Sequence, residues 1–520
     1  MEVTHLMFLY LCTAIAPLMA YRSPTPLPNF IIMLMDDMGY GDLGVFGEPN
    51  KETPNLDRMA AEGALLTDFY TANPLCSPSR AALMSGRLPI RNGFYTDNAH
   101  ARNAYTPQDI VGGVQDEEIL IPELLKEAGY QSKIIGKWHL GHQPQYLPLR
   151  HGFDEWFGAP NCHFGPYDDK STPNIPVYRD EKMIGRYYEG MYNIDHKTGE
   201  SNITAFYIQE ALEFISRPRS SHDPFFLYWA PDSTHAPVYS SAKFLGTSRR
   251  GRYGDAVREL DYGVGVILNR LRELHLADNT LVFFTSDNGA AIVSKTNGGL
   301  NGPFLCGKET TFEGGLHEPG IAWWPGKIEA GRVVRQSATV MDFMATLADF
   351  ANISLPDDRQ LDSMSLRAAL TLGTEVIRPV YYYRGNELMA LRYGLYKAHL
   401  WTWTNGMTEF NHGINFCQGE EVEGVTTHNQ TNHTSQPIIF HLGRDPGEKY
   451  PLKVASAEYK QAWADIKEQV VKHQSTMVPA KPQMNMCDDS VMNWAPPGCT
   501  DLGACLPIPK PNPTKCIWPH

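Results

Sequence analysis

Three apolar runs along the chain are each followed directly by polar residues. The first, NFIIMLM, leads into Asp36 and Asp37, and the second, TLVFFTS, leads into Asp287 and Asn288. A third and weaker run, PFFLYWA, precedes a turn that carries His235. Continuous apolar runs are typical of strands that are buried on both faces of a parallel sheet. We therefore expect three such strands, with polar residues at their carboxyl ends.

An amphipathic helix is predicted just before the second run, within residues 256–279. Apolar residues recur there at spacings of three and four, as the buried face of a helix requires. They are Val257, Leu260, Val264, Ile267, Leu271 and Leu274. A helix followed by a buried strand, repeated along the chain, predicts an α/β fold around a parallel sheet. Ligands bind in such folds outside the carboxyl ends of the strands, where the Asp-bearing turns fall.

The pattern changes near residue 380, where short β-rich pieces such as VYYYRG and PIIFHLGRDPGE appear. We therefore expect residues 21–379 to form the larger domain, which carries the candidate chemistry, and residues 380–481 to form a smaller antiparallel β domain. Residues 482–520 are rich in Cys and Pro and form a predicted tail. A chain of 520 residues has room for this organisation.

The first 20 residues, MEVTHLMFLYLCTAIAPLMA, contain an apolar run that is shorter than a membrane span. We interpret residues 1–20 as a secretory signal peptide; a buried N-terminal helix is the alternative, because this segment lacks Lys and Arg. No later stretch has 18 uninterrupted apolar residues, so we expect no membrane span.

Four sequons fit a secretory route and are predicted glycosylation sites: Asn202, Asn352, Asn429 and Asn432.

The net charge and the cysteine content indicate which binding partners and which cellular compartment to expect. The formal charge of −13 argues against nucleic acid as a partner, whereas protonation of all 18 histidines would change it to +5 and favour an anionic ligand. Four of the nine cysteines lie in the last 34 residues and predict a disulfide-stapled tail, with pairs Cys487–Cys516 and Cys499–Cys505. Parity and position favour Cys306–Cys417 as a third bridge.

The segment CSPSRAALMSGR, which begins at Cys76, is predicted to open a helix, with Pro78 suited to its first turn. A helix start offers unpaired N–H groups and the positive end of the helix dipole, which favour an anion. A small buried cysteine before a helix is the plain structural alternative. Together with the following LPIRNG, the segment resembles the signature of the type I, formylglycine-dependent sulfatases.

This resemblance implies an alkaline-phosphatase-like sandwich fold and an oxidised Cys76. In the family, a formylglycine-generating enzyme converts the cysteine during secretion to formylglycine, whose hydrate is a geminal diol. One hydroxyl attacks sulfur and displaces the sugar alcohol. The other lets the enzyme-bound sulfate leave without a second attack by water. Cys76 would then be neither a disulfide partner nor a thiol nucleophile.

The two Asp-bearing turns suggest a metal site. Asp36 and Asp37 would repel each other unless a cation lies between them, and ligands that are all oxygen point to Ca²⁺ or Mg²⁺. An Asp pair in a turn also often caps a helix, so the pair alone is a weak signal. The resemblance implies one Ca²⁺ ion bound by Asp36, Asp37, Asp287, Asn288 and the formylglycine at position 76.

Basic residues near Cys76 and in GKWHLG match family positions that handle the sulfate group. Lys137 and His139 are two residues apart, so both would face one side of an extended segment. The resemblance implies that Lys137 contacts the sulfate or the diol and that His139 assists sulfate release. It also implies that Arg80 orients the diol, and Tyr105 is expected to form a wall of the substrate pocket.

Two further basic residues, His235 in STHAP and Lys308 in LCGKET, match the family positions that bind sulfate and protonate the leaving alcohol. Such cations stabilise the charge that develops on the sulfuryl oxygens and the departing alkoxide. The chain departs from the family at His317 in EGGLHEPG, where many relatives carry Arg. His317 either touches the active face, with a charge that depends on pH, or lies in a surface turn.

The resemblance covers nearly the whole mature chain, from MLMDDMGYGDLG to LGRDPGE. Longer stretches such as NAHARNAYTPQ and VMNWAPPGC resemble lysosomal members of the family. Those members remove 6-sulfate from N-acetylgalactosamine in chondroitin 6-sulfate and from galactose in keratan sulfate, starting at the non-reducing end. The likeness therefore implies sulfated glycosaminoglycan oligosaccharides as substrates, the lysosome as the compartment, and a homodimer.

Two other functions stay open at this point. A phosphoester hydrolase of the alkaline-phosphatase superfamily would also carry carboxylates at strand ends, but those enzymes mostly use Ser or Thr as nucleophile and often bind two metals. An inactive, secreted glycan-binding relative would keep the fold. The presence of Cys76, Lys137 and His139 argues against an inactive relative.

Overall fold

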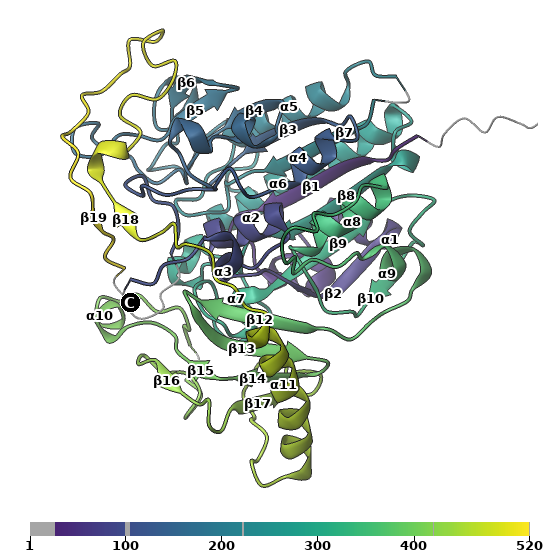
Figure 1. Cartoon of the computed structure of the whole chain (residues 1–520). Coiled ribbons are helices and arrows are strands. Elements are labelled where there is room, and N and C mark those ends of the chain that lie inside the picture. Colours follow the sequence, from purple (N-terminus) through teal and green to yellow (C-terminus); the bar gives the residue numbers. More distant parts are fainter. Residues whose placement is uncertain (1–25, 99–103, 221–222, 420, 519–520) are drawn as a thin grey trace, which may run out of the picture.

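The computed structural model describes residues 26–98, 104–220, 223–419 and 421–518; the predicted signal peptide lies outside them. Their centre is an eleven-stranded sheet in the order β10-β2-β9-β8-β1-β7-β3-β4-β5-β6, with β11 beside β2 (Figure 1). The strands are β1 (Asn29–Met35), β2 (Ala64–Tyr70), β3 (Gln131–Gly136), β4 (Glu155–Gly158), β5 (Pro176–Arg179), β6 (Lys182–Arg186), β7 (Phe225–Ala230), β8 (Thr280–Ser286), β9 (His317–Trp323), β10 (Arg332–Val334) and β11 (Ala338–Thr339). Six of the ten strand pairs are parallel, which confirms the predicted mostly parallel sheet.

The three apolar runs form neighbouring strands at the middle of this sheet. β1 lies between β8 and β7, and β3 pairs with the other edge of β7, all four being parallel. Side chains of β1 alternate between two cores, with Ile32 and Leu34 on one face and Ile31 and Met33 on the other. Because both faces are covered, the strand is apolar at nearly every position.

Helices cover both faces of the sheet and give three layers (Figure 1). One face packs against α1 (Pro54–Glu62), α5 (Ile203–Ile215) and α6 (Gly251–Glu273). The other packs against α2 (Cys76–Ser85), α4 (Ile121–Lys126) and α8 (Asp342–Ala351). The remaining short helices of this domain are α3 (Pro89–Asn92), α7 (Glu313–Leu316) and α9 (Arg367–Leu372). The predicted amphipathic helix is α6, whose apolar positions are buried except Leu274, which lies just beyond its end and is 36% exposed.

A smaller antiparallel sheet follows, in the order β12-β13-β14-β17, with α11 packed across it (Figure 1). Its elements, with the small hairpin β15–β16 and helix α10, are β12 (Pro379–Arg384), β13 (Glu387–Tyr393), β14 (Tyr396–His399), β15 (Trp401–Thr402), α10 (Met407–Asn411), β16 (Thr431–Asn432), β17 (Ile438–His441) and α11 (Ala457–Ser475). The predicted smaller antiparallel domain is therefore present. No helix in the described part of the chain has the length and apolar character that a membrane span needs.

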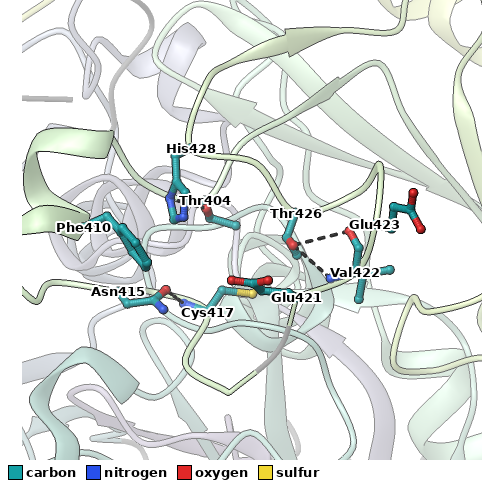
Figure 2. Close-up of a pocket in the computed structure, with 9 residues that line it drawn as sticks. All are labelled: Thr404, Phe410, Asn415, Cys417, Glu421, Val422, Glu423, Thr426 and His428. Atoms are coloured by element: carbon teal, nitrogen blue, oxygen red, sulfur yellow. Dashed lines mark hydrogen bonds between the residues drawn. The ribbon is translucent and has the colours of Figure 1, made fainter.

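The C-terminal tail returns along the larger domain and contains the short pair β18 (Met486–Cys487) and β19 (Thr514–Lys515). Two disulfides, Cys487–Cys516 and Cys499–Cys505, close it, and Cys306–Cys417 joins the two domains; these are the three expected pairs. Beside Cys417 lies a cavity of 340 Å³ lined by Glu421 and Glu423 among others (Figure 2). None of its lining residues belongs to the predicted site.

His317 does not lie in the expected surface turn. It is 5% exposed at the junction of the domains, and its ring stacks on Phe304 at 4.3 Å. Its Nδ1 is 2.9 Å from the Glu313 carboxylate and its Nε2 is 2.7 Å from the Thr67 carbonyl. Glu313 in turn binds Lys397 of β14 at 2.9 Å. His317 therefore belongs to a polar network that joins the domains, which its sequence context did not indicate.

All four sequon asparagines, Asn202, Asn352, Asn429 and Asn432, are exposed. Their side chains are accessible to a glycan in the folded chain, and glycosylation at each stays a prediction.

Candidate active site

Four neighbouring parallel strands, β1, β8, β7 and β3, end at one edge of the sheet and lead into turns that carry several of the predicted site residues. Met35 of β1 pairs with Ser286 of β8, so the next residues, Asp36 and Asp287, emerge side by side. Lys137 follows the end of β3 in the same way. The turns are held together directly, because the Asp37 N–H donates to Asp287 at 3.2 Å and the Asn288 amide donates to Asp37 at 2.8 Å. The expected juxtaposition of the two turns is therefore present.

Helix α2 places Cys76 over these turns. Leu75 is extended and its carbonyl accepts the first helical hydrogen bond, from Ser79, so the helix begins at Cys76. The Cys76 sulfur lies 3.5 Å from Asp36 and 4.0 Å from Asp37. Gly86 ends the helix at φ +66°, where a Cβ would lie 2.9 Å from the Met344 sulfur. A side chain there would meet both backbone strain and a steric clash.

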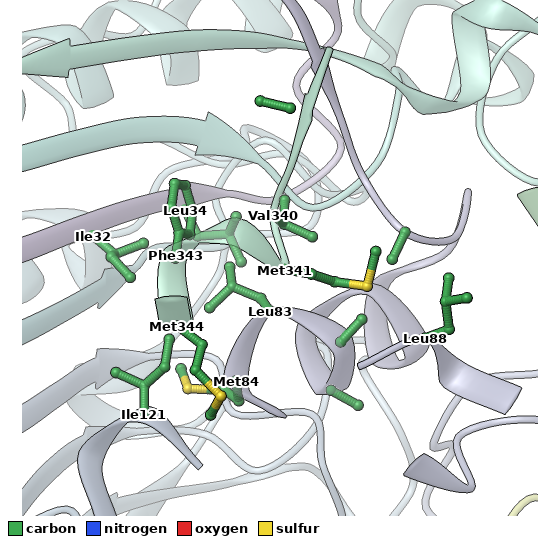
Figure 3. Packing of buried hydrophobic residues seen from close by; sticks show 14 of the residues in the cluster. Ile32, Leu34, Leu83, Met84, Leu88, Ile121, Val340, Met341, Phe343 and Met344 are labelled. Atoms are coloured by element: carbon green, nitrogen blue, oxygen red, sulfur yellow. The ribbon is translucent and has the colours of Figure 1, made fainter. Parts of the chain in front are cut away.

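The helix is fixed by close packing on its buried face. Every residue of α2 is buried, although the helix carries Ser, Arg and Pro as well as apolar residues. Figure 3 shows Leu83 and Met84 of α2 beside Phe343 and Met344 of α8 and near Ile32 of β1. The position of Cys76 is thus set by the same core that supports the Asp-bearing turns.

Three buried cations pair with the three carboxylates. Lys137 Nζ lies 2.7 Å from Asp36, Lys308 Nζ lies 2.6 Å from Asp37, and Arg80 lies 2.8 Å from Asp287. Burial disfavours charged Lys137 and Lys308, but the carboxylates outweigh it and hold both pKa values well above the usual range. All three cations therefore stay charged, as binding of an anion requires.

The donor set fits a hard divalent cation. Ligand atoms of Asp36, Asp37, Cys76 and His235 all lie within 4.8 Å of one another. Asn288 Oδ1 adds a buried oxygen that has no hydrogen-bond donor among the described residues. Carboxylate and amide oxygens suit Ca²⁺ or Mg²⁺, and a cation would both satisfy this oxygen and offset the closely spaced carboxylates. The presence of His235 in this group was not expected, since the sequence assigned it to sulfate.

The two predicted histidines flank the site, and their pKa values are shifted in opposite directions. Burial lowers the pKa of His139 to about 4. Burial also disfavours charged His235, but the Cys162 sulfur and Asp37 outweigh it and raise its pKa to about 9. His235 Nδ1 is 2.8 Å from the Ala236 carbonyl and so carries a proton, while Nε2 faces Asp37 at 3.7 Å. The pair can therefore hold one neutral and one protonated imidazole.

Lys137 and His139 reach the site by a different backbone path from the one expected. The segment after β3 is not an extended strand, and His139 has φ +65°. A hydrogen bond from the Thr106 hydroxyl to the backbone carbonyl of His139, at 3.0 Å, holds this segment in place. Thr106 also contacts Ser77 at 3.0 Å, next to Cys76. The preceding residue, Tyr105, is partly exposed, and its ring lies 6.2 Å from that of His139; its role as a wall of the substrate pocket stays a prediction.

Several residues around the site were missed from the sequence. Cys162 is a buried free thiol, 3.8 Å from His139 and 3.9 Å from His235. The cysteine count could have found it: once six of the nine pair, Cys76 is set apart and Cys12 is assigned to the predicted signal peptide, Cys162 is the one that remains. His163 binds Asp232 at 2.8 Å and the Pro237 carbonyl at 3.0 Å, and so braces the turn that carries His235. No local pattern marked His163 or Asp232.

Comparison with known proteins agrees with this geometry. Residues 28–353 match the sulfatase family and residues 376–507 match the C-terminal region of aryl-sulfatase. The chain is 63% identical to N-acetylgalactosamine-6-sulfatase of Homo sapiens (96% of each chain covered) and 62% to that of Canis lupus familiaris (98% of each). A sulfatase structure from Pseudoalteromonas sp. matches with TM-score 0.72 at 27% identity, covering 87% of this chain and 92% of that one. The chain therefore belongs to the sulfatase family.

Proposed function

We propose that this chain is a sulfuric ester hydrolase that removes 6-sulfate from terminal N-acetylgalactosamine and galactose of chondroitin 6-sulfate and keratan sulfate. The observation that carries the proposal is the buried Cys76 at the start of α2, facing Asp36 and Asp37 and surrounded by cations. The specificity is supported by 62–64% identity, over nearly the full length, to mammalian N-acetylgalactosamine-6-sulfatases.

Cys76 is the proposed nucleophile after its conversion to formylglycine. Burial raises the pKa of the Cys76 thiol well above its usual value, so the unmodified sulfur stays protonated and is a poor nucleophile. A hydrated aldehyde at this position would present hydroxyl groups where the sulfur now lies, beside Asp36 and Asp37. The formylglycine-generating enzyme is therefore the partner we expect during secretion.

The surrounding cations are proposed to bind the sulfate group and guide protons. Lys308 Nζ lies 3.4 Å from the Cys76 sulfur, within reach of a sulfuryl group bound at that position. Lys137 Nζ lies 2.7 Å from the neighbouring carboxylate of Asp36. His235 presents Nε2 to the site and is our candidate to protonate the leaving sugar oxygen, with Lys308 as its neighbour. Arg80 fixes Asp287 and orients the nucleophile.

We further propose that the cation is Ca²⁺, held by Asp36, Asp37, Asp287, Asn288 and residue 76. When bound, it would neutralise the carboxylates and withdraw electron density from the sulfate oxygens. We also propose a lysosomal location and a homodimer, following the relatives at 62–64% identity. An oligosaccharide substrate is supported by a related structure with 26% identity and TM-score 0.66, solved in complex with a neocarrahexaose.

Sulfate release tests the proposal. The purified chain is incubated at acidic pH with N-acetylgalactosamine 6-sulfate, N-acetylgalactosamine 4-sulfate and an aryl phosphate, and free sulfate and phosphate are measured. We expect turnover of the 6-sulfate only. Faster release of phosphate would favour a phosphoester hydrolase, and no release from any of them would favour an inactive glycan-binding protein.

A further inference from the structure

The C-terminal tail, yellow in Figure 1, directs one buried amide side chain toward the segments around the candidate active site. This residue is Asn493, whose backbone carbonyl accepts from Arg186 of β6 at 2.9 Å. Its side-chain Nδ2 donates to Gln108 Oε1 at 2.9 Å and to Asn161 Oδ1 at 3.0 Å. One amide of the tail therefore joins two segments of the larger domain that are far apart in the sequence.

Both oxygens that receive these bonds are fixed as acceptors. Asn161 Nδ2 donates to the Thr106 carbonyl at 2.8 Å, and Gln108 Nε2 donates to the Pro173 carbonyl at 2.8 Å. Because a backbone carbonyl cannot donate, these bonds determine which way each amide points and turn its oxygen toward Asn493. Position 493 therefore requires a group that donates two hydrogen bonds, as the NH₂ of Asn does.

The same segments hold the backbone of His139. Its N–H donates to the Pro160 carbonyl at 3.0 Å, and its carbonyl accepts from the Thr106 hydroxyl at 3.0 Å. His139 has φ +65°, a conformation that a residue other than Gly keeps only where its surroundings impose it. Pro160 precedes Asn161, and Thr106 is bonded to Asn161. The peptide groups on both sides of His139 are therefore held by segments that Asn493 joins.

We propose that Asn493 is a positioning residue, which fixes the backbone of His139 from the C-terminal tail. The proposal rests on the proposed function, because the role of His139 in sulfate release is the one that the sulfatase family implies. A displacement of about 1 Å in a reacting group can lower turnover roughly 10²-fold. The loss should appear in kcat and not in KM, because Lys137 and Lys308, which bind the sulfate group, are held by their own carboxylate partners.

Steady-state sulfate release from N-acetylgalactosamine 6-sulfate by Asn493→Ala tests the proposal. We expect kcat to fall roughly 10- to 10²-fold while KM stays close to that of the wild type. Asn493→Ser, whose hydroxyl can donate to one of the two oxygens, should have an intermediate kcat. It also provides the measurement if Asn493→Ala does not fold. An unchanged kcat, or a loss confined to KM, would overturn the proposal.

Asn485→Ala is the matched control. Asn485 is also an Asn of the tail, and its side chain accepts from the Thr96 hydroxyl at 2.9 Å and donates to Asp97 at 2.6 Å, away from His139. This variant should lower the thermal midpoint and keep its kcat. An equal loss of kcat in Asn485→Ala and Asn493→Ala would show a general effect of loosening the tail and would overturn the proposal.

Thr106→Val breaks the same series of hydrogen bonds at its other end, since it removes the hydroxyl that binds the His139 carbonyl. It should lower kcat, and Thr106→Ser, which keeps the hydroxyl, should not. Adding Asn493→Ala to Thr106→Val should cost little more, because residues of one network do not act independently. Losses that multiply fully would contradict a shared path to His139. A wild type that releases no sulfate would instead reject the proposed function, and this proposal with it.

Discussion

Lys137 offers a sharp test of how the buried ion pairs serve both catalysis and folding. Its ammonium is fully buried and lies 2.7 Å from Asp36. In Lys137→Met, a side chain of similar length removes this charge and leaves the Asp36 carboxylate with Arg80 at 3.7 Å as its nearest cation. Because a preorganised charge near the reacting group is lost, turnover should fall by roughly 10²–10³-fold, or about 2.7–4 kcal/mol.

The same change should destabilise the metal-free fold. Removing one partner of a buried ion pair typically costs about 3–5 kcal/mol, because the other charge stays buried without compensation. Added Ca²⁺ should recover much of this loss, because it replaces the missing positive charge beside Asp36. Urea unfolding with and without Ca²⁺, together with sulfate release under saturating substrate, measures both effects.

Lys133→Met is the matched control. Lys133 lies on β3, four residues earlier, is also buried, and pairs with Glu210 at 2.7 Å, outside the candidate site. It should lose stability by a similar amount and keep its turnover, and Ca²⁺ should not rescue it. The reasoning fails if Lys137→Met retains more than about a tenth of the activity, or if both variants lose turnover equally.

Three further predictions follow from other contacts. Burial lowers the pKa of His473 to about 4, against about 6.5 in the unfolded chain, so the unfolded chain binds more protons between these values. The free energy of unfolding should therefore fall as pH drops from 6.5 toward 4. In urea titrations, His473→Gln should show a smaller fall over this range; a fall as steep as that of the wild type would refute the role of His473. His317→Ala should lower the thermal midpoint by removing donors to Glu313 and Thr67, whereas His317→Arg should keep it; equal midpoints would contradict the network. A chelator should abolish activity and lower the thermal midpoint, with Ca²⁺ restoring both; no shift would exclude a bound metal.

Much of the site was predictable because its signals are local. Asp36 and Asp287 follow directly on apolar runs, and parallel strands with matched register place such residues at one edge. Cys76 was marked by its own helix start and by the segment behind it. In these cases a short stretch of sequence fixes both the element and the position of the residue on it.

The remaining features depend on contacts between distant segments. Thr106 bonds His139 from 33 positions away, and Asn493 meets Asn161 only because the C-terminal tail returns along the larger domain. His317 was misread because its turn looks polar in sequence. Its burial arises from contacts with Thr67 and Tyr70, which lie far from it in the sequence, and no single-segment pattern records them.

The central claim is that the residue at position 76 acts as an aldehyde hydrate and not as a thiol. The most direct measurement is the mass of the tryptic peptide that ends at Arg80, taken from enzyme whose sulfate release has been measured on the same sample. The account predicts formylglycine, with oxygen in place of sulfur and two hydrogens fewer, in proportion to the activity. A fully active preparation that still carries the intact Cys76 thiol would contradict it.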